Sequence, residues 1–594
     1  MKRFLITTAL EETWCIDKPI LFLGEWCRLH DRKDHWRNLD AKVLPYHWDD
    51  RSKLYADYLF LQELYERLLV DLSRQLNQIH GVAHEVRYWR ILIGAWLGYF
   101  TQMLFDRWCS VQQAIAHVEL SGTIILTVQE ETLVPRDMAD FSRLYVEDEW
   151  NHHIYALLLQ KYTSLPCVNK ARQYSDSRAE MGSRVAFKHR VKSALLACYS
   201  KATHILLKDQ DAFFLHTYLP FWDEIKIYLR MGQIPQIWRT KPLISVAVQM
   251  CQREWTVTGN SRSAFETCAR ELISKQIPIA YLEGYSQLIE QIDELPWPKN
   301  PKLIWTSNSH FNDDIFKAWA ADKTERGTPL VIGQHGGLRD VGRWAFFEDH
   351  EISISDCYLS WGWTKPKQPK IKPVGQLKLN RPMGIRHAEQ AHALLVTSTI
   401  PRQSYHMYSG VVSSQWLDYF DDQCNFVQTL PAHIRSQLIV RLSATDFGWS
   451  ERKRWHERFL SLQLHNGQSN IDDLIRQSRV FISTYNATTY LESFAMDVPT
   501  VIFWNPNHWE LCDSATPYFE DLKSVGIFHE TPESAAHHVS AIWNDIDAWW
   551  YSRPVRDVLE CFKAHYCLSQ DDLLGRVEHA LREVIAAVDI TNPQ

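Results

Sequence analysis

Hydroxyl and amide side chains gather where a predicted strand meets a predicted helix. Residues 480–496, VFISTYNATTYLESFAM, begin with an apolar run typical of a buried strand and continue in a helical pattern. The unpaired N–H groups and the dipole at a helix N-terminus attract anions, and hydroxyl groups add hydrogen-bond donors. This chemistry suits a phosphate group. The residues expected to contact it are Ser483, Thr484, Asn486, Thr488 and Thr489.

Glu492 follows Thr488 by one helical turn. A carboxylate at this position can accept hydrogen bonds from sugar hydroxyls such as those of a ribose. The combination predicts a nucleotide-sugar site, with the phosphate on the loop and the ribose at the carboxylate. Ser, Thr and Asn are also preferred helix caps, but the cluster holds more of them than one cap needs. The cluster contains neither GxGxxG nor GxxxxGKS/T, which disfavours a dinucleotide or P-loop enzyme.

His335 lies between glycines in VIGQHGG, at the predicted end of another strand. Gly336 and Gly337 allow the backbone to approach a ligand closely, and an imidazole titrates near neutral pH. His335 could therefore act as a general base on an acceptor hydroxyl or donate a hydrogen bond to a departing phosphate. A structural histidine in a tight turn is the alternative.

Charged residues at other predicted strand ends are candidates for the same site. Glu11 and Glu12 follow the first strand, where one of them, Glu12 first, could serve as a base or orient an acceptor sugar; ordinary loop solvation is the alternative. An arginine at a strand end could pair with a phosphate through two hydrogen bonds or form a surface salt bridge. The further donor contacts expected at such positions are Arg402, Arg441, His508 and Glu510.

Two clusters near the N-terminus leave their role open. YHWDDR supplies His47, Asp49, Asp50 and Arg51, either for acceptor binding or for a structural network. EDEWNHH, residues 147–153, pairs carboxylates with imidazoles four residues apart, a spacing that can hold a metal, but the sequence has no HExxH motif. We therefore expect no metal and no cofactor.

The segments around these residues alternate between predicted strands and predicted helices. PKLIWTSNS, FNDDIFKAWAADKTE and TPLVIGQHGG form one strand–helix–strand series, and residues 393–506 form another. Such series are typical of parallel sheets. The pattern predicts an α/β protein of two parallel-sheet domains, joined near residues 365–390. The N-terminal domain, residues 1–385, would carry a helical insertion at about 52–200; residues 386–560 would form the C-terminal domain, and residues 561–594 a helical segment.

The composition narrows the function classes. A chain of 594 residues is too long for one hydrophobic core. A net charge of −7 argues against a broad nucleic-acid surface. The twelve cysteines are scattered and the N-terminus lacks a secretory signal, so we expect reduced thiols and a cytoplasmic location. The most apolar segment, residues 91–105, is shorter than the roughly 20 residues of a membrane span and predicts a buried helix.

Several of these segments resemble a known family. STYNATTYLE followed by PTVIFWNPNHWEL, with GQHGG upstream, looks like the nucleotide-sugar half of a two-domain glycosyltransferase of the GT-B type. The whole chain, including LEETW, YHWDDR and YWRILIGAWL, is similar to a transferase family of bacterial O-antigen and surface-polysaccharide gene clusters, and more distantly to capsule and ulosonic-acid transferases. One departure is the loop Ser443–Asp446, where a basic or histidine-bearing loop is expected; this leaves Arg441 as its only cation.

The resemblance implies a GT-B-like fold, with two Rossmann-like domains facing a cleft, and a metal-independent glycosyltransferase. Its partners would be a nucleotide-sugar donor and a glycan or lipid-linked glycan acceptor, with peripheral contact at the inner face of the inner membrane. Three alternatives stay open: a CDP-polyol phosphotransferase, a nucleotide-sugar epimerase, and a non-catalytic scaffold of polysaccharide assembly.

Overall fold

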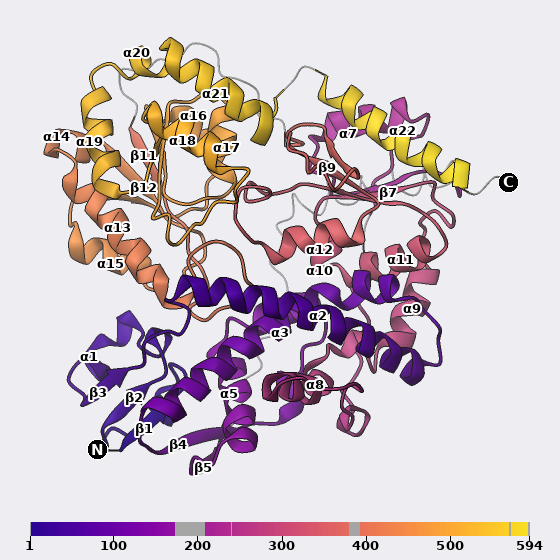
Figure 1. The fold of residues 1–594 in the computed structure, drawn as a ribbon, viewed down its shortest axis with the longest axis vertical. Helices are drawn as coiled ribbons and strands as arrows, with labels where there is room; N and C mark the ends of the chain where they lie inside the picture. The colour runs from indigo at the N-terminus through magenta and orange to yellow at the C-terminus, as the bar shows by residue number, and fades with distance from the viewer. Residues whose placement is uncertain are drawn as a thin grey trace, which may run out of the picture.

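The computed structural model describes residues 2–172, 208–238, 240, 242–378, 392–569 and 572–591. In these ranges the chain is a mixed α/β fold whose strands form three parallel sheets, at three corners of the molecule in Figure 1. The predicted α/β class with parallel sheets is confirmed. The expected number of sheets, two, was wrong: residues 3–171 and 213–373 each form a sheet of their own.

The first sheet has the strand order β3-β2-β1-β4-β5. Its strands are β1 (Arg3–Ile6), β2 (Ile20–Phe22), β3 (Ala41–Val43), β4 (Leu120–Thr127) and β5 (Cys167–Ala171). Its helices are α1 (Lys33–Trp36), α2 (Arg51–His80), α3 (Val86–His117), α4 (Met138–Leu144) and α5 (Asp148–Tyr162). The region predicted as a helical insertion therefore contains β4 and β5, and the helices α2 and α3 are the crossover that leads into β4.

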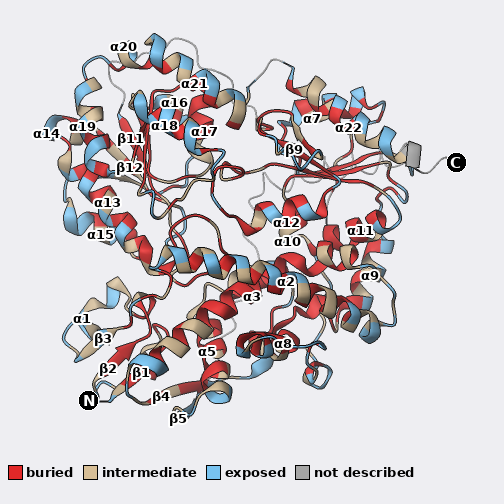
Figure 2. Ribbon diagram, in the orientation of Figure 1, coloured by how far each residue is buried: buried red, intermediate tan, exposed pale blue. Residues whose placement is uncertain are grey.

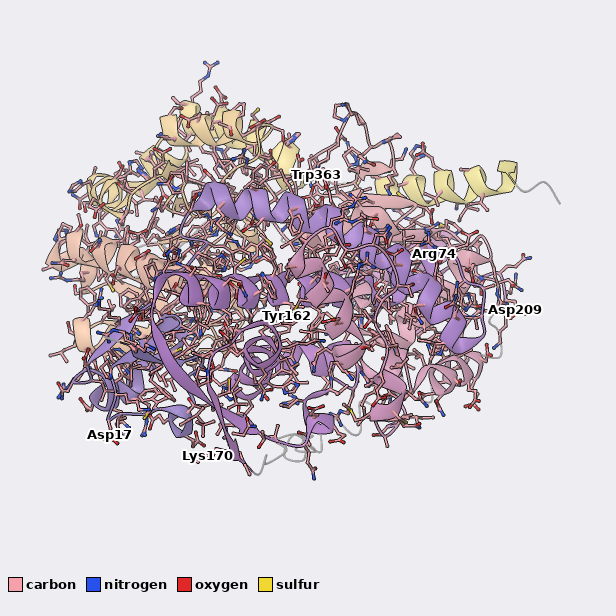
Figure 3. All side chains as sticks on the ribbon, turned by 60° about the horizontal axis from the view of Figure 1, so that its bottom comes forward. Asp17, Arg74, Tyr162, Lys170, Asp209 and Trp363 are labelled. Carbon is pink, nitrogen blue, oxygen red and sulfur yellow. The ribbon has the colours of Figure 1, made fainter. Side chains whose placement is uncertain are left out.

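The apolar segment 91–105 lies in α3, and the predicted buried helix is confirmed. The helix runs beside α2 through the middle of the molecule, as Figures 1 and 3 both show. Its residues 91–107 are buried around the whole circumference (Figure 2). Gly94 and Gly98 make this packing possible, because a Cβ atom on Gly98 would lie 1.8 Å from the Phe346 ring. No helix in the described ranges is long and apolar enough to cross a membrane.

The second sheet has the order β10-β9-β8-β7-β6 and follows the chain without a reversal. Its strands are β6 (Phe213–Leu215), β7 (Ile304–Thr306), β8 (Leu330–Gly333), β9 (Cys357–Ser360) and β10 (Ile371–Pro373). Its helices are α7 (Phe221–Arg230), α8 (Ala264–Gln276), α9 (Tyr285–Asp293), α10 (Ser309–Asn312), α11 (Asp314–Glu325) and α12 (Phe346–Ile354). The predicted connection near residues 365–390 thus includes the edge strand β10. The predicted domain boundary at residue 385 lies outside the described residues.

The third sheet has the order β13-β12-β11-β14-β15-β16. Its strands are β11 (Ala393–Val396), β12 (Leu438–Arg441), β13 (Gln463–His465), β14 (Val480–Ser483), β15 (Thr500–Phe503) and β16 (Phe528–His529). Its central strands are continuous apolar runs because helices cover both faces of a parallel sheet. The helices are α13 (Trp416–Thr429), α14 (Ala432–Arg435), α15 (Glu451–Arg458), α16 (Ile471–Gln477), α17 (Thr488–Ala495), α18 (Thr516–Ser524), α19 (Pro532–Ile542), α20 (Ile546–Trp550), α21 (Arg553–Tyr566) and α22 (Leu573–Thr591), the last of which packs on α7.

Candidate functional site

The third sheet has a topological switch point between β11 and β14. β11, the first strand of this sheet, lies beside β14, the fourth. The connections after these two strands therefore leave toward opposite faces and open a crevice at the carboxyl ends of the strands. Doubly wound sheets bind their ligands in this crevice. Ser483, the last residue of β14, pairs with Val396, the last residue of β11. The predicted hydroxyl cluster therefore begins at this switch point.

The inner hydroxyls of the cluster already have partners within the protein. The Thr484 hydroxyl donates to the Val396 carbonyl at 2.9 Å and lies 2.5 Å from the Tyr419 hydroxyl. The Ser483 hydroxyl donates to the Tyr485 carbonyl at 3.3 Å. Both side chains are buried. These contacts fix the loop after β14, so the two hydroxyls have a structural role that the sequence did not indicate.

The outer part of the cluster is different. Thr488 and Thr489 are the first two residues of α17, and no side chain caps this helix. Its first amide groups and the positive end of its dipole are therefore left for a ligand. The side-chain nitrogen of Asn486 is buried and has no hydrogen-bond partner in the described part of the chain. Thr488, Asn486 and the uncapped helix end are thus the donors at this edge that remain unused.

The loop that follows β8 in the second sheet contacts this helix end. The backbone N–H of Gly337 donates to the Thr488 hydroxyl at 3.2 Å. A Cβ atom on Gly337 would lie only 2.5 Å from the Ala487 carbonyl oxygen, so glycine is required for the close approach. Residues 334–337 and 483–492, the two segments predicted to form the site, therefore meet although they belong to different sheets. Their meeting place is the His335–Thr488 junction.

His335 sits beside a buried ion pair. The Arg339 guanidinium donates to Glu351 at 2.6 Å and to the Nε2 atom of His335 at 3.4 Å. Nδ1 then carries the proton of the neutral ring, and it faces the Glu351 carboxylate at 3.4 Å. Burial, reinforced by the Arg339 charge, lowers the pKa of His335 to about 3. His335 is therefore neutral at physiological pH.

Glu351 holds this group together. Burial acts to raise its pKa, but the charge of Arg339 and the neighbouring His335 and His310 outweigh burial and hold the pKa well below the usual range. The Tyr358 hydroxyl donates to its second oxygen at 3.0 Å. Glu351 is thus a permanent buried anion. Sequence reasoning missed it because α12 brings it to His335 across a gap of sixteen positions, and no short motif marks such a pair.

Two further residues were missed at the exposed side of the junction. Tyr218, in the loop after β6, stacks toward His335 with ring centroids 6.0 Å apart and has a left-handed backbone with φ of 67°. Lys378 forms an ion pair with Glu492 at 2.6 Å. Burial raises the pKa of Glu492, although Lys378 opposes the shift. The signal for Tyr218 was absent from the sequence, since a left-handed tyrosine has no local pattern.

Other predicted site residues lie elsewhere. Arg402 pairs with Asp148 at 2.6 Å and donates to the Phe447 carbonyl at 3.0 Å, so it ties the third sheet to α5. Glu11 accepts two hydrogen bonds of 2.7 Å from Arg32. Arg402 therefore forms a salt bridge, which was the alternative to a phosphate contact. Glu11 is paired with Arg32, apart from His335, Arg339 and Glu351.

Glu12 and Arg441 have weaker ties. Glu12 is exposed beside the first sheet, 3.6 Å from Arg172. Arg441 ends β12 and donates to the Gly467 carbonyl at 2.9 Å, while its buried Nε atom has no hydrogen-bond partner among the described residues. Burial lowers the pKa of Arg441. Arg441 therefore keeps one donor for a ligand, whereas Glu12 has no contact with the junction.

The YHWDDR segment forms a structural network. Arg51 binds the Glu510 carboxylate through two hydrogen bonds of 2.7 and 2.8 Å, joining α2 to the loop after β15. The side chain of Asp50 caps α2, and His47 lies 3.0 Å from Asp106. The carboxylate of Glu510 is consequently occupied. Burial lowers the pKa of the adjacent His508 to about 4, so this ring is neutral.

In the described ranges, no cluster of three or more His, Cys, Asp or Glu side chains has the geometry of a metal site. Asp148 of the predicted i,i+4 pair instead binds Arg402, and the His152 ring accepts from the Leu126 N–H at 2.9 Å. Burial lowers the pKa of His152 to about 4.

Comparison with known proteins gives one clear relationship. Solved structures with a partial likeness include the wall teichoic acid polymerase TagF (9% identity, 67% of this chain and 97% of that chain, TM-score 0.31). A second is the Thermobaculum terrenum O-GlcNAc transferase (12% identity, 89% of this chain and 99% of that chain, TM-score 0.35). A third is Acinetobacter baumannii MurG (8% identity, 63% of this chain and 99% of that chain, TM-score 0.32). No curated protein matches the sequence. A family model described as LIC12162 family transferase matches residues 3–581, nearly the whole chain. The chain therefore belongs to the LIC12162 family of transferases.

Proposed function

We propose that this transferase is a glycosyltransferase, which moves a sugar from a nucleotide-activated donor to a glycan acceptor. The observation that carries the proposal is the hydrogen bond between Gly337 and Thr488. It joins an uncapped helix N-terminus, which suits a diphosphate, to a loop that holds a neutral imidazole. Transfer from a phosphate leaving group needs an anion site and a base close enough together to contact the same bound substrate.

In this proposal the third sheet binds the donor. The α17 amides, Thr488, Thr489 and the Asn486 amide nitrogen bind the phosphates, and Glu492 accepts hydrogen bonds from the ribose. Lys378, which is paired with Glu492, turns to the same phosphates when the donor binds. The charge that develops on the leaving group is carried by the helix end and Lys378, so the step needs no metal.

His335 is the proposed catalytic base, or a hydrogen-bond donor to the leaving phosphate. Its Nε2 atom accepts from Arg339 in the structure, so the substrate must draw Arg339 away before Nε2 can accept a proton from an acceptor hydroxyl. A bound diphosphate supplies the anion that does this. It also offsets the charge of Arg339, which acts to lower the pKa of His335, so the imidazole becomes a stronger base when the donor is bound.

The resemblance to surface-polysaccharide transferases supports the finer assignment. The acceptor would be a growing surface glycan or O-antigen, free or lipid-linked, and the donated sugar could be a ulosonic acid. The site of action would be the cytoplasm, at the inner face of the inner membrane. The described cysteines are all free thiols, which agrees with a reducing compartment.

Thermal-shift binding tests the proposal. UDP, GDP, CDP, CMP and dTDP are added to the wild type and to Thr488→Val. One nucleotide should raise the melting temperature of the wild type, because a ligand of the folded state stabilises it, and should have less effect on the variant. Thr516→Val is the matched control, since Thr516 is also the first residue of a helix, α18.

Activity with the sugar derivative of that nucleotide then separates the alternatives. Glycosyl transfer that is lost in His335→Ala supports the proposal. Transfer from a CDP-polyol would indicate the phosphotransferase, and isomerisation of the sugar would indicate the epimerase. Full function of His335→Ala in cells, or no response to any nucleotide, would favour the scaffold.

A further inference from the structure

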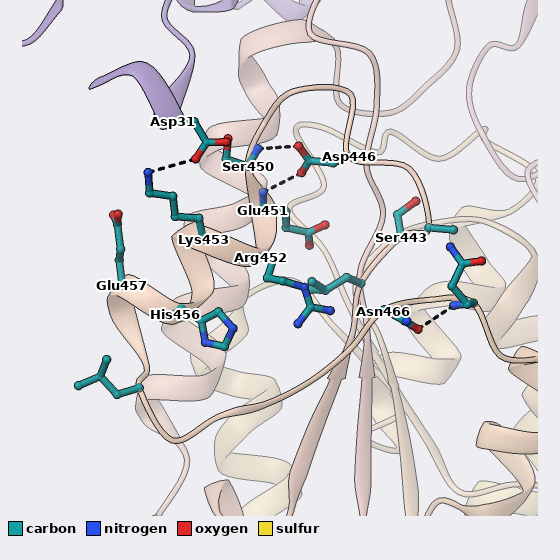
Figure 4. Close-up of a pocket in the computed structure, with 14 residues that line it drawn as sticks. Asp31, Ser443, Asp446, Ser450, Glu451, Arg452, Lys453, His456, Glu457 and Asn466 are labelled. Carbon is teal, nitrogen blue, oxygen red and sulfur yellow. Dashed lines mark hydrogen bonds and ion pairs between the residues drawn. The ribbon is translucent and has the colours of Figure 1, made fainter. Parts of the chain in front are cut away.

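A cavity opens at the β12–β13 half of the third sheet. It has a volume of about 830 Å³ and lies beyond the ends of β12 and β13, against α15. Figure 4 shows its lining, to which the loop after β2 contributes Asp31. None of its lining residues belongs to the His335–Thr488 junction. A cavity of this size holds a ligand of one or two sugar rings.

The carboxylates at the rim are occupied. Asp31 pairs with Lys453 at 3.1 Å and Glu457 with Lys33 at 2.8 Å. Asp446 caps α15 by accepting from the backbone N–H groups of Ser450 and Glu451 at 2.8 and 2.7 Å. The charges of Asp31 and Glu457 are therefore balanced by lysines, and the Asp446 carboxylate is held against the start of α15.

Two basic side chains on α15 have no such partner. Arg452 and His456 are four residues apart, so they share one face of the helix. Neither forms a hydrogen bond or ion pair with a side chain of the described residues. The lining thus has an unused cation and an unused imidazole on the same side of the cavity.

Glu451, the first residue of α15, places a buried carboxyl group at the cavity. Its side chain is only 2% exposed, lines the cavity, and leaves its Oε1 atom without a hydrogen-bond partner in the described chain. Burial raises its pKa to about 7, although Thr397 and Trp455, which lie beside the carboxyl group and outside the lining, act to lower it. In Figure 4 the carboxyl group lies among the lining side chains. An unmet buried acceptor is costly unless a ligand satisfies it.

We propose that this cavity binds a sugar ring that carries an oxyanion, either a carboxylate or a phosphate. Arg452 and His456 bind the oxyanion, and Glu451 exchanges a hydrogen bond with a ring hydroxyl. The amide side chains of Asn466 and Gln468 line the same cavity and supply further contacts for hydroxyl groups. A bare anion would leave most of this volume and the Glu451 oxygen unused. The identification of this ring as part of the acceptor glycan rests on the proposed function; the binding itself does not.

The test is titration calorimetry of the full chain with glucuronate, glucose 6-phosphate and glucose. Because one charge-assisted hydrogen bond contributes about 1.5–3 kcal/mol, an anionic sugar should bind at least roughly tenfold more tightly than glucose. Arg452→Gln should remove this preference. Arg458→Gln is the matched control on the same helix, where the arginine pairs with Asp421 outside the cavity. Glu451→Gln keeps a neutral hydrogen-bonding group and should retain the preference.

The comparison of glucuronate with glucose 6-phosphate identifies the oxyanion. Equal binding of glucose and both anionic sugars, or an unchanged preference in Arg452→Gln, would overturn the proposal. Thr488→Val should leave this binding intact. Anionic-sugar binding in a chain that binds no nucleotide would refute only the proposed function, so the two failures are distinguishable.

Discussion

Replacing Arg339 by methionine is expected to raise the pKa of His335. Arg339 and Glu351 each lie 3.4 Å from a ring nitrogen of His335, and their charges are opposite. At an effective dielectric of about 20, each interaction is worth about 5 kcal/mol, or more than three pKa units. The two cancel, which leaves burial to hold the pKa at about 3. Without Arg339 the attraction of Glu351 is unopposed, so we expect a rise of at least two units.

The assay is an NMR pH titration of the His335 C2 proton, assigned by its loss in His335→Gln. Removing one partner of a buried ion pair costs about 3–5 kcal/mol of stability. The double variant Arg339→Met/Glu351→Gln is therefore measured too, and its His335 pKa should return toward the wild-type value. Arg343→Met is the control, because Arg343 lies over the Tyr55 ring rather than against Glu351. A pKa in Arg339→Met equal to that of the wild type would refute the cancellation argument.

Three further results are expected. Gly337→Ala should destabilise the protein by about 1–3 kcal/mol in denaturant melts, because its methyl group meets the Ala487 carbonyl. Gly336→Ala should cost less, since its methyl meets a side-chain nitrogen of Arg339 rather than a backbone atom. Arg402→Met should lower stability but leave nucleotide affinity in the thermal-shift assay unchanged; a loss of affinity would return Arg402 to the donor site. Acid should destabilise the wild type more steeply than His335→Gln. The pKa of His335 is about 3 in the folded chain, below its value in the unfolded chain. The contribution of His335 to stability is therefore complete above about pH 6.5 and is lost as the pH falls toward 3. Parallel pH profiles for the two proteins would contradict this.

The local elements near the junction were predictable because their signals are local. The strand VFIS and the helix that begins at Thr488 follow from hydrophobic pattern and length, and the approach of His335 follows from the rule that parallel strands present their carboxyl ends to ligands. The hydroxyls of Ser483 and Thr484 form hydrogen bonds within the protein, and the sequence does not distinguish such side chains from ones that contact a ligand.

The features of the fold and site that the sequence does not predict depend on contacts between distant segments. The first sheet was merged with the second because β4 follows the two long helices α2 and α3, and its partner β1 lies over a hundred residues earlier. Arg402 was expected to meet a phosphate, but Asp148 on α5 is its partner. Glu351 and Lys378 enter the site only when the tertiary structure brings them there. No local pattern records such pairings.

Hydrogen–deuterium exchange with and without the stabilising nucleotide tests whether the donor binds at the His335–Thr488 junction. We expect slower exchange in two separate peptides, one covering residues 334–340 and one covering residues 484–492, because the donor binds where these segments meet. Thr488→Val should weaken protection of both together. Protection of only one segment, or protection confined to the first sheet, would contradict a donor site at the His335–Thr488 junction.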